Sequence, residues 1–238
     1  MKVEMEIELL QPWSTFVMAT KLPPSILEKM ITITDEIVEN KSGEGDDPGA
    51  GQLIDQFYID FETLEEDVMG FFLDMCRHYV IQALCQSNPF NKENILKEEY
   101  ITKLTRMWIN SQKDNEYFPV HIHTLCAMSS VMYLKIPEYL PPRKTADRLV
   151  HTHADVDEDG AIVFLNNVAK NNIWGMPAMT ITPLVGDFFI FPASQIHQVY
   201  PFRTPDGKGE RRSVSFNANF SSNVMGYRKE YGGEGETL

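Results

Sequence analysis

The feature that most constrains the fold of this chain is a series of short β-type segments after residue 100. Each segment is rich in β-branched and aromatic residues, and turn-forming residues separate most of them. A series of this kind is typical of a jelly-roll sandwich of two sheets. The expected strands are Tyr100–Ser111, Pro119–Leu125, Ser129–Ile136, Ala161–Asn166, Met179–Pro183, Asp187–Phe191, Gln198–Phe202 and Arg212–Phe220.

The first hundred residues predict helices instead. Apolar residues recur at near-helical spacing within Ile26–Val38, after a capping-box pattern that begins at Ser25. A second apolar stripe extends over Leu64–Leu84, after a similar pattern that begins at Thr63. We therefore expect an α+β, mainly β fold in which N-terminal helices buttress the jelly roll.

The sequence predicts one domain, residues 1–238, because a chain of this length with 43% hydrophobic residues can bury a sizeable core. Within it we expect a mostly helical support region at 1–100 and the β core at 101–222. The acidic, turn-rich stretch 137–160 is long for a strand connection, which is typical of a functional loop such as a lid. The Gly- and Glu-rich tail 226–238 is expected to be flexible.

Charge and cysteine content narrow the class of protein. The formal net charge of −13 disfavours general binding to nucleic-acid phosphates. Cys76, Cys85 and Cys126 lack metal-type spacing, which indicates reduced thiols in a cytosolic protein. The first residues are acidic where a signal peptide is basic, and no apolar stretch has the length of a membrane span. We expect a cytoplasmic protein without a membrane partner.

Three histidines far apart in the sequence predict a metal site. His121 and His123 are two positions apart in an expected strand, so their side chains point to the same face. His197 follows Gly186–Pro192, a glycine turn and a buried strand that deliver this histidine to the rim of a sheet. Together the three imidazoles can bind one metal ion and leave some of its coordination positions open.

A second polar set follows the third histidine. Arg211, Ser213 and Ser215 alternate along the last expected strand and therefore share one face. A guanidinium is a permanent cation whose planar donors match a carboxylate. A metal ion with open positions beside such an arginine indicates an acidic cosubstrate, and therefore an enzyme.

With these residues the sequence resembles the 2-oxoglutarate- and iron(II)-dependent oxygenases, most of all their small bacterial and phage branch with a prolyl-hydroxylase-like layout. The resemblance covers roughly residues 104–220, and the helical N-terminal third matches only in general layout. Each piece is common, but the ordered set is specific. The matching stretches are Trp108–Asn110, His121–His123, Ser129–Leu134, Gly186–Pro192, His197 and Arg211–Asn217.

The resemblance implies a double-stranded β-helix that holds iron(II) at its open end and uses 2-oxoglutarate and O2 as cosubstrates. The implied reaction is hydroxylation of an unactivated C–H bond, in a peptidyl proline, another protein residue or a small molecule. Arg211 and Ser213 fit the RxS motif, whose arginine holds the distal carboxylate of 2-oxoglutarate. By resemblance Tyr133 also hydrogen-bonds that carboxylate, and Asn110 is a candidate contact that could equally be structural. Arg212 should point to the opposite face and serve the fold.

The third metal ligand departs from the common pattern. Most of the superfamily has Asp or Glu where this chain has His123, although the branch that it resembles also carries HxH. A remote carboxylate could be the ligand instead, with the His123 imidazole in a supporting position, or two protein ligands and water could suffice. His153 and Asp155 form a literal HxD pattern, but they lie in the acidic loop, where a solvated loop is the more ordinary interpretation.

Two other functions stay open at this point. The set His121, His123 and His197 alone would also suit a three-histidine cupin-type dioxygenase that uses no 2-oxoglutarate. A non-catalytic jelly-roll binding module with structural or zinc-binding histidines is the second alternative. Arg211 and its RxS context favour the 2-oxoglutarate enzyme, and release of succinate would discriminate between them.

Overall fold

The computed structural model of the chain describes residues 16–42, 53, 55–140, 158–165, 178–222 and 229–231. Its helices are α1 (Pro24–Asn40), α2 (Glu66–Ser87) and α3 (Lys92–Lys97), with the short 3-10 turns η1 (Phe61–Thr63) and η2 (Pro89–Asn91). Its strands are β1 (Met18–Lys21), β2 (Gln56–Tyr58), β3 (Tyr100–Lys113), β4 (Phe118–His121), β5 (Met128–Lys135), β6 (Ile162–Leu165), β7 (Ala178–Ile181), β8 (Asp187–Pro192), β9 (His197–Val199), β10 (Glu210–Ser222) and β11 (Lys229–Tyr231).

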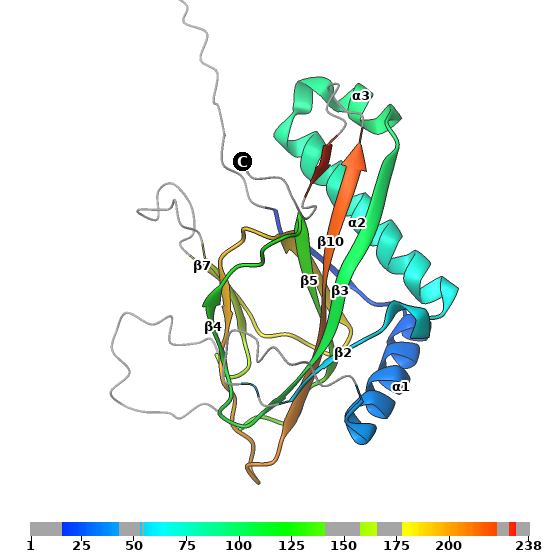
Figure 1. Cartoon of the computed structure of the whole chain (residues 1–238). Coiled ribbons are helices and arrows are strands. Elements are labelled where there is room, and N and C mark those ends of the chain that lie inside the picture. Colours follow the sequence, from blue (N-terminus) through cyan, green and yellow to red (C-terminus); the bar gives the residue numbers. More distant parts are fainter. Residues whose placement is uncertain are drawn as a thin grey trace, which may run out of the picture.

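The strands form two antiparallel sheets of a double-stranded β-helix, or jelly roll (Figure 1). In the seven-stranded sheet the order is β1-β8-β5-β10-β3-β2, and β11 pairs with β10. The four-stranded sheet has the order β4-β9-β6-β7. The expected fold class, mainly β with helices before the sandwich, is confirmed.

The larger sheet buries both of its faces because its side chains alternate between two apolar layers. Along β8, Phe188 and Ile190 pack with the helices, whereas Phe189 and Phe191 pack between the two sheets. In Figure 1, α1 and α2 lie on one side of this sheet and β4 and β7 lie on the other. The helices therefore cover the outer face, and the inner face lines the space between the sheets.

Each of the eight expected strands is present, with bounds that differ by a few residues. The largest shifts are at β4, which ends at His121, and at β9, which ends at Val199. His123 therefore lies just beyond the strand in which it was expected. The short strands β1, β2 and β11 were not expected, because segments of 4, 3 and 3 residues show no periodicity of their own.

Both expected helices are present, but neither capping box is. Helix α1 begins at Pro24, whose fixed φ suits the first helical position, so Ser25 lies inside the helix and no side chain caps it. Thr63 belongs to η1, and its hydroxyl donates to the Asp60 carbonyl at 2.7 Å. Helix α2 begins only at Glu66. Both patterns are wrong because a helix start depends on the preceding backbone as well as on a polar side chain.

Some expectations fall on parts of the chain that the structure does not describe. Residues 141–157 of the expected acidic loop are outside the described residues, and with them His153 and Asp155. Of the tail 226–238, only Lys229–Tyr231 is described, as β11. Among the described helices, none combines the length and the apolar character needed to cross a bilayer.

The buried side chain of Arg212 connects β10 to α1. It is 3% exposed, and its guanidinium lies 2.5 Å from Asp35 Oδ1 and 2.7 Å from Glu210 Oε1. One Nη also donates to the Thr34 hydroxyl at 3.5 Å. As expected, Arg212 points away from the face that carries Arg211 and serves the fold.

We expect Arg212→Met to lower the free energy of unfolding by about 2 kcal/mol, because it leaves Asp35 and Glu210 without their buried partner. Urea denaturation measures this change. The control is Arg77→Met, which removes an exposed ion pair with Asp74 and should change stability by less than about 0.5 kcal/mol. Equal losses in the two variants would contradict the role given to Arg212.

Candidate metal centre

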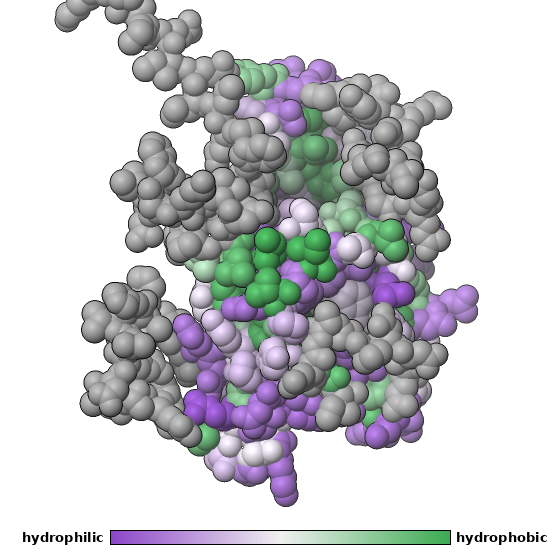
Figure 2. Space-filling model, turned by 60° about the vertical axis from the view of Figure 1, so that its left-hand side comes forward, coloured by the Kyte–Doolittle hydropathy of each residue, from purple (hydrophilic) through white to green (hydrophobic). Residues whose placement is uncertain are grey.

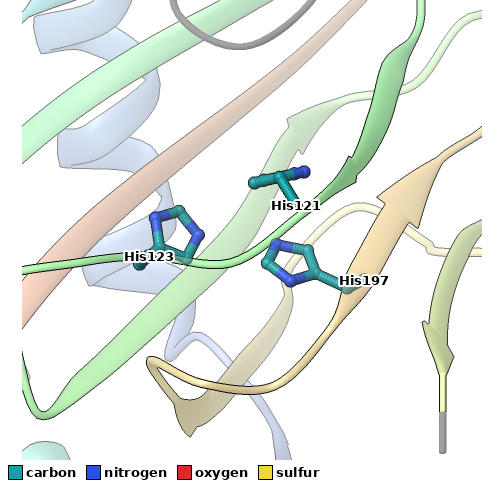
Figure 3. Close-up of side chains that lie close together, drawn as sticks. All are labelled: His121, His123 and His197. Carbon is teal, nitrogen blue, oxygen red and sulfur yellow. The ribbon is translucent and has the colours of Figure 1, made fainter. Parts of the chain in front are cut away.

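The structure brings the three expected histidines together at one end of the sandwich (Figure 3). His121 on β4 and His197 on β9 are direct partners in the antiparallel pairing of these strands. His123 follows β4, and its backbone N–H donates to the Ala193 carbonyl at 2.9 Å, which holds it beside them. One ligand atom from each imidazole lies within 4.8 Å of the other two, a spacing that suits one metal ion.

Backbone carbonyls fix the tautomer of two of these rings. His121 Nδ1 lies 2.7 Å from the Pro119 carbonyl, and His197 Nδ1 lies 2.8 Å from the Gln195 carbonyl. Because a carbonyl oxygen only accepts, each Nδ1 carries the hydrogen and each Nε2 keeps its lone pair. A metal-binding histidine is usually oriented by such a bond from its other ring nitrogen.

The surroundings of the histidines are aromatic and keep them neutral. The ring of Phe191 lies 4.8 Å from that of His197, and the ring of Trp108 lies 5.8 Å from that of His123. Burial, and then the neighbouring imidazoles, lower the pKa of His123 to about 3 and that of His197 to about 4. Burial also lowers the pKa of His121. Neutral imidazoles are the form that binds metal ions.

The histidines line a cavity of about 950 Å³ between the sheets. Among the described residues, the cavity wall holds no aspartate or glutamate, and the cluster of possible ligands consists of the three histidines alone. Imidazole nitrogen suits iron, zinc, copper and nickel, so this donor set fits a divalent first-row metal ion. Three protein ligands leave further positions open for cosubstrate.

The buried guanidinium of Arg211 lines the same cavity and is only 2% exposed. Its Cζ lies 5.4 Å above the ring of Tyr133. Its two Nη atoms donate to the carbonyl of Gly160 and to Gln112 Oε1, both of which are neutral acceptors. Arg211 Nε and the Tyr133 hydroxyl are buried and have no hydrogen-bond partner among the described residues. A buried charge with unpaired donors is costly, so this arrangement fits an anion that accepts from both groups.

Gln112 was not expected at the site from the sequence. It lies opposite Arg211 in the pairing of β3 with β10. Its Nε2 donates to the carbonyls of Glu116 at 2.5 Å and Tyr200 at 3.3 Å, which turns Oε1 towards Arg211. The position of Gln112 beside Arg211 follows from the register of β3 and β10, which the sequence does not reveal.

The remaining expected site residues also line this cavity. Ser213 and Ser215 are buried on the inner face of β10, and Asn110 is buried on β3 opposite Ser213. Asn110 Oδ1 accepts from Gln56 Nε2 at 2.7 Å, so this oxygen already has a structural partner. All eight site residues expected from the sequence therefore meet around one space, although Asn110 is partly engaged in the fold.

This geometry defines a candidate mononuclear non-haem metal centre at the open end of a double-stranded β-helix. Residues 106–217 match the model of a family described as putative 2OG-Fe(II) oxygenase. The match includes every expected site residue and confirms the resemblance of the β core to the 2-oxoglutarate- and iron(II)-dependent oxygenases.

Three solved structures are similar to this chain at low sequence identity. A Pseudomonas putida prolyl-4-hydroxylase is 15% identical with a TM-score of 0.48, and the match covers 84% of this chain and 91% of that one. The viral collagen prolyl hydroxylase of Paramecium Bursaria Chlorella virus-1 is 12% identical with a TM-score of 0.47, and the match covers 85% of this chain and 94% of that one. A Burkholderia pseudomallei oxidoreductase of the 2OG-Fe(II) oxygenase family is 14% identical with a TM-score of 0.47, and the match covers 84% of this chain and 83% of that one. No curated protein matches the sequence.

We expect His197→Ala and His123→Ala each to lower the affinity for iron(II) more than about 100-fold, because each removes a ligand rather than a supporting group. Anaerobic titration of the metal-free protein with iron(II) measures this. His78→Ala, on the exposed face of α2, is the matched control and should bind iron(II) like the parent.

The two variants test different assignments. Unchanged affinity in His197→Ala would contradict the whole metal centre. Unchanged affinity in His123→Ala alone would contradict only this histidine as third ligand, and would favour a carboxylate from elsewhere in the chain.

Proposed function

We propose that the protein is an iron(II)- and 2-oxoglutarate-dependent dioxygenase that hydroxylates an unactivated C–H bond. One observation carries this proposal: a buried arginine with no anionic partner among the described residues shares a cavity with three neutral histidines. A cationic metal and a cationic side chain in one cavity suit a cosubstrate with two acidic groups. 2-Oxoglutarate is such a molecule.

His121, His123 and His197 would hold iron(II). When bound, the metal supplies the oxidative chemistry, in which 2-oxoglutarate, O2 and a substrate C–H bond give succinate, carbon dioxide and a C–OH group. The chain itself supplies orientation, because the Pro119 and Gln195 carbonyls hold two imidazoles in the metal-binding tautomer. The aromatic rings around the histidines restrict access of water to the reacting centre.

Arg211 and Tyr133 would bind the distal carboxylate of the cosubstrate. Arg211 Nε and the Tyr133 hydroxyl are buried donors of the cavity wall without a partner in the part of the chain that the structure describes, and the stacked guanidinium and phenol ring face the same space. Gln112 positions the guanidinium by accepting from Nη2. Ser213, on the same face of β10, is a further candidate contact.

The replacement of a carboxylate by His123 fits this assignment electrostatically. A neutral imidazole leaves the full charge of the metal ion uncompensated by the protein. The attraction between that charge and an anionic cosubstrate is correspondingly larger than it would be with a carboxylate ligand. HxH therefore supports binding of a dianion rather than loss of function.

The two alternative functions leave features of the cavity unexplained. A three-histidine dioxygenase without 2-oxoglutarate shares the metal ligands but leaves Arg211 buried with no anion to bind. A non-catalytic module with zinc leaves the unpaired donors of Arg211 and Tyr133 unexplained. The primary substrate stays a prediction, either a residue of a peptide or protein or a small molecule.

We expect Arg211→Met to weaken 2-oxoglutarate binding at least about 30-fold, because truncating one partner of a buried charge pair costs about 2 kcal/mol or more. Methionine keeps most of the side-chain volume and cannot donate. Calorimetric titration of the anaerobic iron(II) protein with 2-oxoglutarate measures the change, and Arg77→Met is the control.

Iron affinity is the second readout of this experiment and should not change in Arg211→Met. If the variant binds 2-oxoglutarate like the parent, Arg211 does not bind the cosubstrate and the proposed function loses its main support. If iron affinity falls as well, the arginine acts on the fold of the metal centre instead.

A further inference from the structure

The first half of β3, which pairs with the second half of β10, carries two cations on the surface that leads to the metal centre. These strands extend past the smaller sheet (Figure 1). Lys103 and Arg106 are exposed on β3 and line the same cavity as the histidines. Neither forms an ion pair with any of the described residues. Arg106 is instead held over the ring of Tyr58, with its Cζ 5.3 Å from the ring centroid.

A β-bulge places both cations on one face. Arg106 is opposite Asn217 in β10, and Lys103 is opposite Asn219, whereas Thr105 has no opposite residue. Asn217 and Asn219 are two positions apart, so they and their partners share a face. Without the extra residue, positions 103 and 106 would face opposite ways. Bulges beside active sites commonly redirect a side chain in this manner.

The local charge opposes the charge of the chain as a whole. The sequence has 34 acidic and 21 basic residues, yet the described wall of the cavity has no acidic side chain and includes Lys103, Arg106 and Arg211. Arg211 is buried in the depth of the cavity, whereas Lys103 and Arg106 lie at its exposed end. Two cations held together on one face, without a counter-ion in the described part of the chain, indicate an anionic ligand that binds there.

The backbone of the same segment offers a strand edge. Strand β2 pairs with β3 only from Trp108 to Asn110, so residues 101–106 have no strand partner on that edge within the described part of the chain. An open edge can pair with an extended peptide, whose side chains then contact the face beside it. Nucleic acids and small molecules do not use such an edge.

The edge ends at the metal centre. Trp108, the first residue of β3 that pairs with β2, contacts His123. From Trp108 to Lys103 an extended strand spans about 17 Å, at about 3.3 Å per residue. A small molecule held at the metal would not reach this far, whereas a peptide would. Exposed apolar side chains, Ile122 and Leu125, flank the cavity after β4, and Figure 2 shows an apolar patch on that side of the molecule.

We propose that the primary substrate is an acidic segment of a polypeptide, which binds in extended form along residues 101–106 of β3 with its carboxylates on Lys103 and Arg106. This inference rests on the proposed function and specifies its substrate class. Lys103 and Arg106 act as specificity-determining residues, and the residue to be oxidised lies beyond them, next to Trp108 and the metal.

The test uses a fluorescein-labelled dodecapeptide of alternating glutamate and threonine, which favours an extended chain. The matched probe has glutamine in place of glutamate. Anisotropy measures binding to the anaerobic protein saturated with iron(II) and 2-oxoglutarate, so that Arg211 is already occupied. We expect the glutamate peptide to bind at least about ten-fold more tightly than the glutamine peptide, since only glutamate forms ion pairs with Lys103 and Arg106.

The double variant Lys103→Glu/Arg106→Glu should lose at least about ten-fold in affinity for the glutamate peptide. Lys92→Glu/Lys97→Glu on α3 makes the same change in net charge away from the cavity, and should stay within about two-fold of the parent. Far-UV circular dichroism and iron content show that each variant keeps its fold.

Four results would overturn the inference: no binding of either peptide, equal binding of both, equal losses in the two double variants, or tighter binding of a twelve-nucleotide oligothymidylate at Lys103 and Arg106. The last result would assign the surface to nucleic acid. Binding of 2-oxoglutarate is measured in the same samples. If it binds and the peptide result is negative, only the substrate class fails; if it does not bind, the proposed function fails.

Discussion

The burial of two adjacent arginine side chains in β10 governs the arrangement of this protein. Because side chains alternate along a strand, Arg212 faces the helices and Arg211 faces the cavity between the sheets. Arg212 is neutralised by Asp35 and Glu210, and in this way fastens α1 to the sheet. Arg211 meets only neutral acceptors among the described residues. The fold therefore compensates one buried charge itself and leaves the other for a ligand.

The rest of the described cavity wall likewise leaves positive charge uncompensated by the protein. Its histidines are kept neutral by burial, so they can bind a metal ion without reducing its charge. The described cavity wall has no acidic residue in a chain whose net charge is −13. A metal ion and Arg211 in the interior suit a small dianion, while Lys103 and Arg106 at the exposed end suit an acidic substrate. The net negative charge of the chain disfavours binding of an acidic substrate elsewhere on the surface, so this cationic end of the cavity is where such a substrate is expected to bind.

Much of the fold and site could be predicted from sequence because the signals are periodic. Alternation identified eight strands and placed Arg211 and Ser213 on one face, and the HxH spacing brought two histidines together. Features set by the register of distant strands could not be predicted. Gln112 meets Arg211 only because of the pairing of β3 with β10, and the bulge at Thr105 places Lys103 on the same face as Arg106. The predicted helix starts were wrong for a related reason, because the geometry of the preceding backbone outweighed the local capping pattern.

The most direct test of the central claim is the fate of 2-oxoglutarate in a single turnover. Protein loaded with one equivalent of iron(II) is mixed with 2-oxoglutarate and O2, and succinate is measured together with oxygen uptake. Since Arg211 and three histidines share one cavity, we predict that succinate forms with the iron(II) protein and not with the metal-free protein. Oxygen uptake without succinate, or no uptake by a protein that has bound both iron(II) and 2-oxoglutarate, would contradict the account.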